Sequence, residues 1–120
     1  MKGAGVAEGW IVACLCAEWC GACREYRPVF EAAAVGSAAR FAWVDIEEHP
    51  DVLGEREVES FPTLLIAHGG DVAFFGPVTP HAGAITALVD RALAGRLGTL
   101  ADDSIAALAA RVAAHVHVGR

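Results

Sequence analysis

The chain has 120 residues, of which 55% are hydrophobic and 20% are charged, a composition that fits one folded domain and argues against intrinsic disorder. The formal net charge of −6 argues against nucleic acid as a partner, since nucleic acid attracts basic surfaces. No apolar run approaches the roughly 18 residues that a membrane span needs, so we expect no membrane partner either.

The first half of the chain predicts a strand, a helix and a second strand. Residues 1–9 are rich in Gly and Ala, and we expect them to be flexible. Trp10–Cys16 is a continuous apolar run, typical of a central strand that is covered on both faces. From Cys20 onwards apolar residues recur at helical spacing, and Pro28 is expected to kink this helix. The predicted second strand is Phe41–Ile46. The apolar face of the helix consists of Tyr26, Val29, Phe30 and Ala33.

The second half predicts a short helix, a hairpin and two longer helices. A short helix is expected from Pro50 to about Val58. Strands at Thr63–Ala67 and Val72–Phe75 should form a hairpin, joined by a turn over His68–Asp71. One longer helix begins at Thr79 and Pro80 and ends at Gly95, and the last helix is expected at about Asp103–Val116. This βαβαββαα order predicts an α/β protein whose mixed sheet has helices on both faces.

The cysteines are the most informative feature of the sequence. All four lie in one short segment, at Cys14, Cys16, Cys20 and Cys23. Cys20 and Cys23 form a C-x-x-C pair at the predicted strand-to-helix junction, which is typical of redox sites. The N-terminus of a helix favours an anion, so we expect Cys20 to be a thiolate and a nucleophile. Cys23 lies one turn further along, within reach to close a disulfide.

Two other interpretations of the cysteines stay open. Four thiolates are enough for a tetrahedral zinc site, although two of them lie inside an apolar strand pattern rather than in turns. Cys14 and Cys16 point to the same face of their strand, because side chains alternate along a strand. They are either small buried apolar residues or, if that face lies under the C-x-x-C pair, auxiliary thiols that exchange with it.

Several segments together resemble the thioredoxin family over roughly residues 10–94. The segment Ala17-Glu18-Trp19-Cys20-Gly21-x-Cys23 is similar to the active-site segment of that family. Pro28 matches the proline that kinks its active-site helix, and Asp45 to Pro50 resembles the segment after its central strand. Phe61-Pro62-Thr63-Leu64-Leu65 matches its cis-proline strand, and Gly76 resembles the glycine that flanks its substrate groove.

The resemblance implies a fold and a role for each matched residue. The fold would be thioredoxin-like, with a mixed four-stranded sheet, helices on both faces and an extra C-terminal helix. Residues 1–9 would be a flexible N-terminus, residues 10–95 the domain, and residues 96–120 a helical extension packed on it. Cys20 would attack and Cys23 would resolve. Pro62 would be cis and face them, and the groove would be lined by Trp19, Gly21, Ala22, Phe61, Pro62 and Gly76.

The chain departs from the family pattern at four points. Ala22 replaces the proline that usually separates the two cysteines. Cys14 and Trp43 stand where the family usually has a buried aspartate and a lysine, so both members of that charged pair are absent. Only nine residues precede the first strand, where another strand and helix are usual. We therefore expect Phe41–Ile46 to be an edge strand, with the added C-terminal helix or a second chain covering the surface left open.

The resemblance implies a thiol–disulfide oxidoreductase that needs no bound cofactor and no metal. Its partners would be disulfide-containing proteins and a reducing protein or small thiol, and it would be a monomer or a homodimer. The apolar start of the chain runs directly into the C-x-x-C pair, so we read no signal peptide and expect the cytoplasm. The alternative is a thioredoxin-like binding or chaperone module with weak redox turnover, which the missing charged pair favours.

Overall fold

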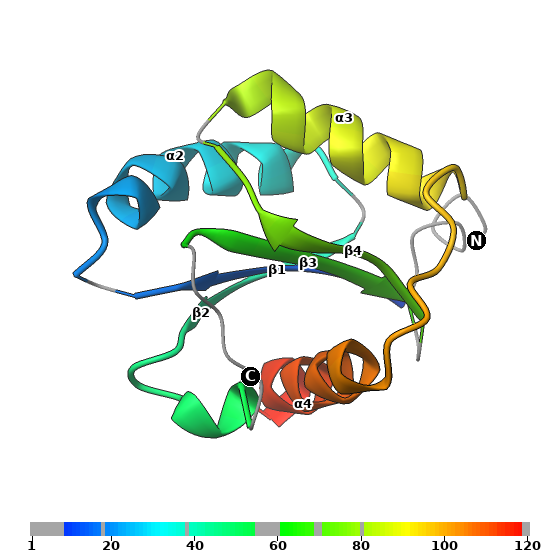
Figure 1. The fold of residues 1–120 in the computed structure, drawn as a ribbon. Helices are drawn as coiled ribbons and strands as arrows, with labels where there is room; N and C mark the ends of the chain where they lie inside the picture. Colours follow the sequence, from blue (N-terminus) through cyan, green and yellow to red (C-terminus); the bar gives the residue numbers. More distant parts are fainter. Residues whose placement is uncertain are drawn as a thin grey trace.

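The computed structural model describes residues 9–17, 19–37, 39–54, 61–68, 71–79 and 81–118. Its elements follow the predicted order (Figure 1). In chain order they are β1 (Trp10–Cys16), α2 (Gly21–Val35), β2 (Arg40–Asp45), η1 (Pro50–Val52), β3 (Thr63–His68), β4 (Asp71–Pro77), α3 (Ala82–Leu93) and α4 (Asp103–Val118).

The strands form one mixed four-stranded sheet with the order β2-β1-β3-β4. β1 pairs in parallel with β2, and α2 makes the crossover that this pairing requires. β1 also pairs antiparallel with β3, and β3 pairs antiparallel with β4. The expected mixed sheet with helices on both faces is confirmed, and β2 lies at one edge of the sheet as expected.

The two faces of the sheet are covered by different helices. In Figure 1, α2 and α3 lie on one face, and α4 and η1 lie on the other. Side chains alternate along β1, so this strand contributes to the packing on both faces of the sheet. Val12, Cys14 and Cys16 pack under α2 and α3, in what we call the first core. Ala13 and Leu15 point the other way, into a second core under α4. The second core contains four residues of the last helix, namely Ile105, Leu108, Ala109 and Val112. The division of the chain into three segments stays a prediction.

The helix predicted from Pro50 to about Val58 is wrong as a continuous element. The structure has a 3₁₀ turn at Pro50–Val52 instead. Gly54 has φ of +60°, a left-handed conformation that ends a right-handed helix and favours glycine. Residues 55–60, on which the rest of this prediction falls, lie outside the described residues, as do residues 69, 70 and 80 of the predicted hairpin turn and helix start.

The other boundaries differ by a few residues. The second strand is one residue earlier than predicted, and Ile46 follows it with its N–H bonded to the Cys16 carbonyl at 2.9 Å. β3 and β4 are longer than predicted because their pairing extends to Asp71 and to Pro77, the ends of the hairpin. α3 begins at Ala82, after an extended His81.

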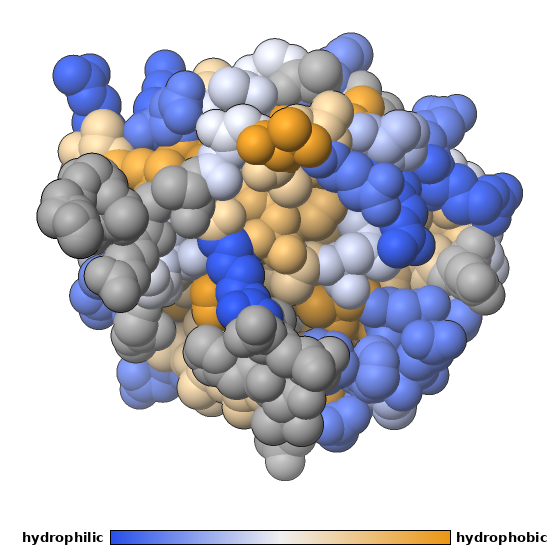
Figure 2. Space-filling view, turned by 180° about the vertical axis from the view of Figure 1, so that it is seen from behind, coloured by the Kyte–Doolittle hydropathy of each residue, from blue (hydrophilic) through white to orange (hydrophobic). Residues whose placement is uncertain are grey.

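The surface is mixed in character. In the view from behind, apolar surface crosses the middle of the molecule between hydrophilic regions (Figure 2). No helix in the described ranges is long and apolar enough to cross a membrane.

Candidate active site

Cys20 lies in the turn between β1 and α2 and is the residue that precedes the first turn of the helix. Its backbone N–H donates to the carbonyl of Ala17 at 3.0 Å, and its own carbonyl accepts from the N–H of Arg24 at 3.3 Å. The Cys20 thiol is partly exposed and donates to the carbonyl oxygen of Phe61 at 3.7 Å. The strand end, the helix start and the segment before β3 therefore meet at this sulfur.

The Phe61–Pro62 peptide bond is cis, as expected. Pro62 is buried, and its carbonyl accepts from the N–H of Val78 at 3.1 Å. The ring of Phe61 meets the ring of Trp19 edge to face, with centroids 5.9 Å apart and planes at 88°, a favoured aromatic arrangement. Trp19 is 64% exposed, so these two rings form an apolar surface beside Cys20.

The remaining predicted groove residues are Gly21, Ala22 and Gly76. Gly21 is the exposed first residue of α2, and Ala22 follows it, partly exposed. Gly76 pairs with Leu64 in the β3–β4 ladder, two residues beyond Pro62. A Cβ atom at Gly76 would lie 3.6 Å from the ring of Phe74, an ordinary contact, so space alone does not demand a glycine there.

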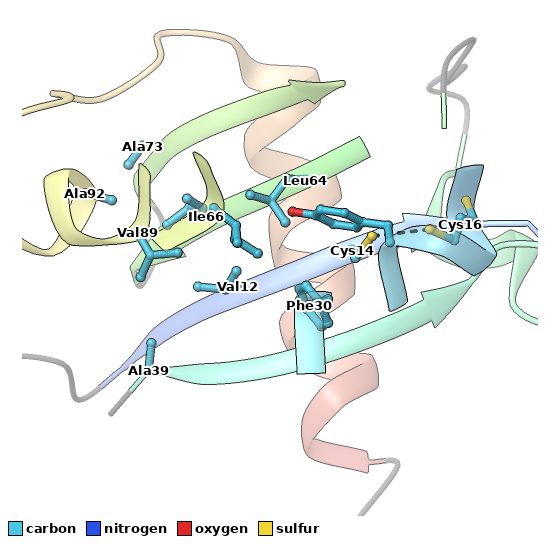
Figure 3. Close-up of a cluster of buried hydrophobic side chains, with 13 residues drawn as sticks. Val12, Cys14, Cys16, Phe30, Ala39, Leu64, Ile66, Ala73, Val89 and Ala92 are labelled. Carbon is cyan, nitrogen blue, oxygen red and sulfur yellow. Dashed lines mark hydrogen bonds between the residues drawn. The ribbon is translucent and has the colours of Figure 1, made fainter. Parts of the chain in front are cut away.

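The four thiols form a chain that runs from the surface into the first core. The sulfurs of Cys14 and Cys16 are 3.2 Å apart (Figure 3). Cys16 and Cys23 line one pocket, and the thiols of Cys16 and Cys20 both raise the pKa of Cys23. All four are free thiols, and all except Cys20 are buried. The strand face that carries Cys14 and Cys16 thus lies under the C-x-x-C pair, where exchange between the two pairs is possible.

Burial and mutual contact hold the inner thiols in their protonated form. Burial, followed by the hydrogen bond with Cys16, raises the pKa of Cys23 well above its ordinary value. The hydrogen bond with Cys14, followed by burial, raises the pKa of Cys16 strongly. A resolving thiol in this setting must lose its proton as it reacts, because its thiolate is scarce near neutral pH.

The two positions that lack the family's charged pair are neighbours in the sheet. Cys14 and Trp43 are partners in the register of β1 and β2. The guanidinium of Arg27, on α2, lies over the ring of Trp43 at 5.1 Å from its centroid, within cation–π range. The buried charged pair is therefore replaced by a thiol and by an aromatic ring that is covered by a cation.

A pocket of about 270 Å³ opens beside these residues. The residues that line it include Cys16, Cys23, Trp43 and Arg27, so two of the buried cysteines border this pocket. The sequence did not reveal this pocket, and it left open whether Cys16 lies under the C-x-x-C pair. The only signal for that position was the alternation that places Cys16 on the face of β1 turned towards α2.

The zinc interpretation finds no geometric support. Within the described ranges, no group of three or more His, Cys, Asp or Glu side chains is arranged to hold a metal ion.

The chain is similar in sequence to known thioredoxins. The family model for Thioredoxin matches residues 6–88. The thioredoxin of Listeria monocytogenes is 38% identical over 68 residues, which is 55% of this chain and 66% of that protein. Thioredoxin-2 of Saccharomyces cerevisiae is 37% identical over 82 residues, 68% of this chain and 74% of that protein. The chain thus spans about two thirds of the length of these relatives, and 57% in the case of the thioredoxin of Rhodospirillum rubrum.

Solved structures agree on the fold. A mutant thioredoxin from Halobacterium salinarum has a TM-score of 0.62 at 24% identity, covering 74% of this chain and 79% of that one. Thioredoxin from Schistosoma mansoni has a TM-score of 0.63 at 19% identity, with coverage of 71% and 78%. Since the family model matches more than half of the residues and the fold agrees, the chain belongs to the thioredoxin family.

Proposed function

We propose that this chain is a thiol–disulfide oxidoreductase that acts on protein disulfides through Cys20 and Cys23. The observation that carries the proposal is the position of Cys20: it is the partly exposed thiol of the chain of four, placed at the start of α2 and 3.7 Å from the carbonyl of Phe61. Cys23 lies one turn further along α2 and is shielded from solvent.

The reaction follows from this asymmetry. The Cys20 thiolate attacks a substrate disulfide, and one substrate sulfur leaves as a thiolate. Cys23 then loses its proton and attacks the Cys20 sulfur, which releases the second substrate thiol and leaves a Cys20–Cys23 disulfide. A reducing protein or a small thiol returns the pair to the dithiol. The cycle requires no bound cofactor, and we place it in the cytoplasm, in a monomer or a homodimer.

The groove would be formed around Trp19, Phe61 and Pro62. The apolar rings offer surface to an extended substrate segment, and backbone beside a proline, which lacks an N–H of its own, is available to pair with that segment. Gly21 and Ala22 at the start of the helix, and Gly76 on β4, would form the rest of its rim.

The test is reduction of insulin disulfides by dithiothreitol, followed as turbidity. The chain should accelerate the reaction, and Cys20→Ser should abolish the acceleration. Cys23→Ser should accumulate mixed disulfides with partner proteins that dithiothreitol removes, whereas Cys20→Ser should trap none. Iodoacetamide should label Cys20 first in the native state, because Cys14, Cys16 and Cys23 are 0%, 1% and 2% exposed.

The opposite results identify the alternative function. If the chain does not accelerate insulin reduction but still suppresses the aggregation of an unfolded protein, it is a binding or chaperone module. That outcome is favoured by the burial of the Cys23 thiol, which is 2% exposed: burial raises its pKa, and the family's buried carboxylate is replaced by Cys14.

A further inference from the structure

We propose that Cys16 is a third exchange thiol, which takes over the active-site disulfide and stores it as a buried Cys16–Cys23 bridge. This inference rests on the proposed function, because it begins from the Cys20–Cys23 disulfide that the cycle leaves. Cys16 and Cys23 are both buried in the first core and line the same pocket, and each thiol affects the pKa of the other. Cys23 is therefore between two thiols that can each bond to it.

The exchange balances without any external oxidant. The Cys16 thiol gives up its proton to solvent, and its thiolate attacks the Cys23 sulfur. The Cys16–Cys23 bond forms as the Cys20–Cys23 bond breaks, and the electron pair leaves on the Cys20 sulfur, which then takes up a proton. One disulfide is consumed and one is made, so the oxidation state of the chain does not change.

Two features of the site favour the product. Cys20 is the partly exposed member of the chain of thiols, so the leaving thiolate forms where water reaches it. The new bridge is uncharged and joins β1 to α2 inside the first core, where an ion would be costly. The pocket of about 270 Å³ lined by both Cys16 and Cys23 gives these sulfurs room to move during the exchange.

A bridge between Cys14 and Cys16 is the weaker alternative, although their sulfurs are 3.2 Å apart. Residues two apart in an extended strand have Cα atoms about 6.6–6.8 Å apart, at the upper limit of disulfide geometry. β1 is also hydrogen-bonded on both sides, to β2 and to β3, so it resists the contraction that this bridge needs. Cys14 instead acts on Cys16 through their hydrogen bond.

The stored bridge has a defined consequence for activity. Cys20 is free to attack a substrate, but Cys23 is no longer free to resolve the mixed disulfide. The chain then behaves as a monothiol until Cys20 attacks Cys23 and reverses the exchange. Because the Cys16 thiolate is scarce, the exchange is slow near neutral pH, and its rate should rise about tenfold per pH unit.

The sequence offers a direct assay, because Glu18 separates the two pairs of cysteines. The reduced chain is oxidised with one equivalent of diamide at pH 7 and pH 8, quenched in acid at intervals, blocked with N-ethylmaleimide in denaturant and cut with endoprotease Glu-C. Early samples should contain peptide 19–25 with an internal disulfide. Later samples should contain peptides 9–18 and 19–25 joined through Cys16 and Cys23, with the blocking group on Cys14 and Cys20, and the joined peptides should appear about tenfold faster at pH 8.

Matched variants and a parallel assay separate the two proposals. Cys14→Ser should still form the joined peptides, and Cys16→Ser should keep the internal disulfide of peptide 19–25. A wild-type chain that reduces insulin but keeps this internal disulfide for hours at pH 8, or that forms a Cys14–Cys16 or Cys16–Cys20 bridge instead, overturns the inference and leaves the proposed function standing. A chain that never forms the Cys20–Cys23 disulfide overturns both.

Discussion

At the scale of single residues, Tyr26 is the buried side chain that the sequence pattern explains least. Its ring packs in the first core beside Phe30, with no exposed surface. Its hydroxyl is buried and has no hydrogen-bond partner among the described residues. A buried polar group without a partner lowers stability by about 1–3 kcal/mol. The ring is therefore expected to stabilise the core and the hydroxyl to weaken it.

The first prediction separates the contribution of the Tyr26 ring to stability from that of its hydroxyl. Tyr26→Phe should leave the free energy of unfolding unchanged or raise it by up to about 1–3 kcal/mol, because it removes only the unpaired oxygen. Tyr26→Leu, the control, should lower it by a few kcal/mol, since it removes part of a buried ring. Urea unfolding of the reduced chain measures both. A clear loss of stability in Tyr26→Phe would mean that the hydroxyl has a partner.

The second prediction concerns the buried thiols and pH. The pKa values of Cys16 and Cys23 are raised by folding, so the folded chain keeps protons that the unfolded chain releases near the ordinary value of 9.0. Their contribution to stability is complete below that pH and is lost as the pH rises towards the folded values. Above about pH 9, each thiol should lower the free energy of unfolding by about 1.4 kcal/mol per pH unit.

Urea unfolding of the reduced chain from pH 7 to pH 10.5 measures this slope. Oxidation to the Cys20–Cys23 disulfide removes the titration of Cys23 and should make the slope shallower. Cys16→Ala should make it shallower still. A free energy of unfolding that stays constant across this range would contradict the protonated, buried state of both thiols.

At the scale of elements, α4 is fastened to the segment that follows β2. Arg111 donates from Nε to the carbonyl of Val52 and from Nη2 to the carbonyl of Leu53, both at 2.8 Å. These carbonyls lie at the end of the 3₁₀ turn, where terminal carbonyls need donors from outside the helix. At Gly54, an added Cβ atom would lie 2.7 Å from the Arg111 guanidinium, so a glycine fits this close approach as well as the positive φ.

The third prediction tests this connection. Arg111→Leu should lower the free energy of unfolding by about 1.5–3 kcal/mol, because two backbone carbonyls lose a charged donor. Gly54→Ala should also destabilise the chain, through the clash and the left-handed backbone. Arg91→Leu, at an exposed position on α3, is the control and should change little. Equal stability of the Arg111 and Arg91 variants in urea would show that the contact has no energetic role.

Sequence periodicity was sufficient for most of these elements but not for the contacts between them. The apolar run at Trp10–Cys16 is a strand with the same bounds in the structure, because a strand buried on both faces must be apolar throughout. The turn at Pro50–Val52 was predicted as a longer helix, because the pattern alone does not reveal that Gly54 adopts a positive φ against Arg111. Whether Cys16 lies beside Cys23 stayed open for a similar reason, since that proximity joins a strand to a helix.

At the scale of the whole molecule, two cores share one sheet, and each is closed by helices from different parts of the chain. Side chains of β1 and β3 alternate between the cores, with Leu64 and Ile66 on one side and Leu65 and Ala67 on the other. Without α4, the face of the sheet that carries the second core would keep only η1 as cover among the described elements. β2 is an edge strand of the sheet in the described part of the chain, and edge strands are prone to pair with another chain.

The last prediction is that the molecule does not fold as a stable monomer without its C-terminal helix. Leu108 is fully buried, and Leu108→Ala alone should lower the free energy of unfolding by about 2–5 kcal/mol. Deleting residues 101–120 also removes Ile105, Ala109 and Val112 from the second core. The combined loss is comparable to the whole stability of a small domain, about 5–15 kcal/mol. The deletion begins after Leu100 so that its N–H bond to the Val72 carbonyl, at 2.7 Å, is kept.

The truncated chain should therefore unfold, or associate through the exposed face and the edge of β2. The stability of Leu108→Ala should lie between those of the truncated and intact chains. Ala110→Gln, at an exposed position of the same helix, is the control and should be about as stable as the intact chain. Sedimentation and urea unfolding measure the two effects. A truncated chain that remained monomeric and as stable as the intact one would mean that α4 contributes nothing to the second core. Cys20 and Cys23 adjoin the first core, not the second. The activity per folded molecule should therefore be normal in these variants, even where the folded fraction is reduced.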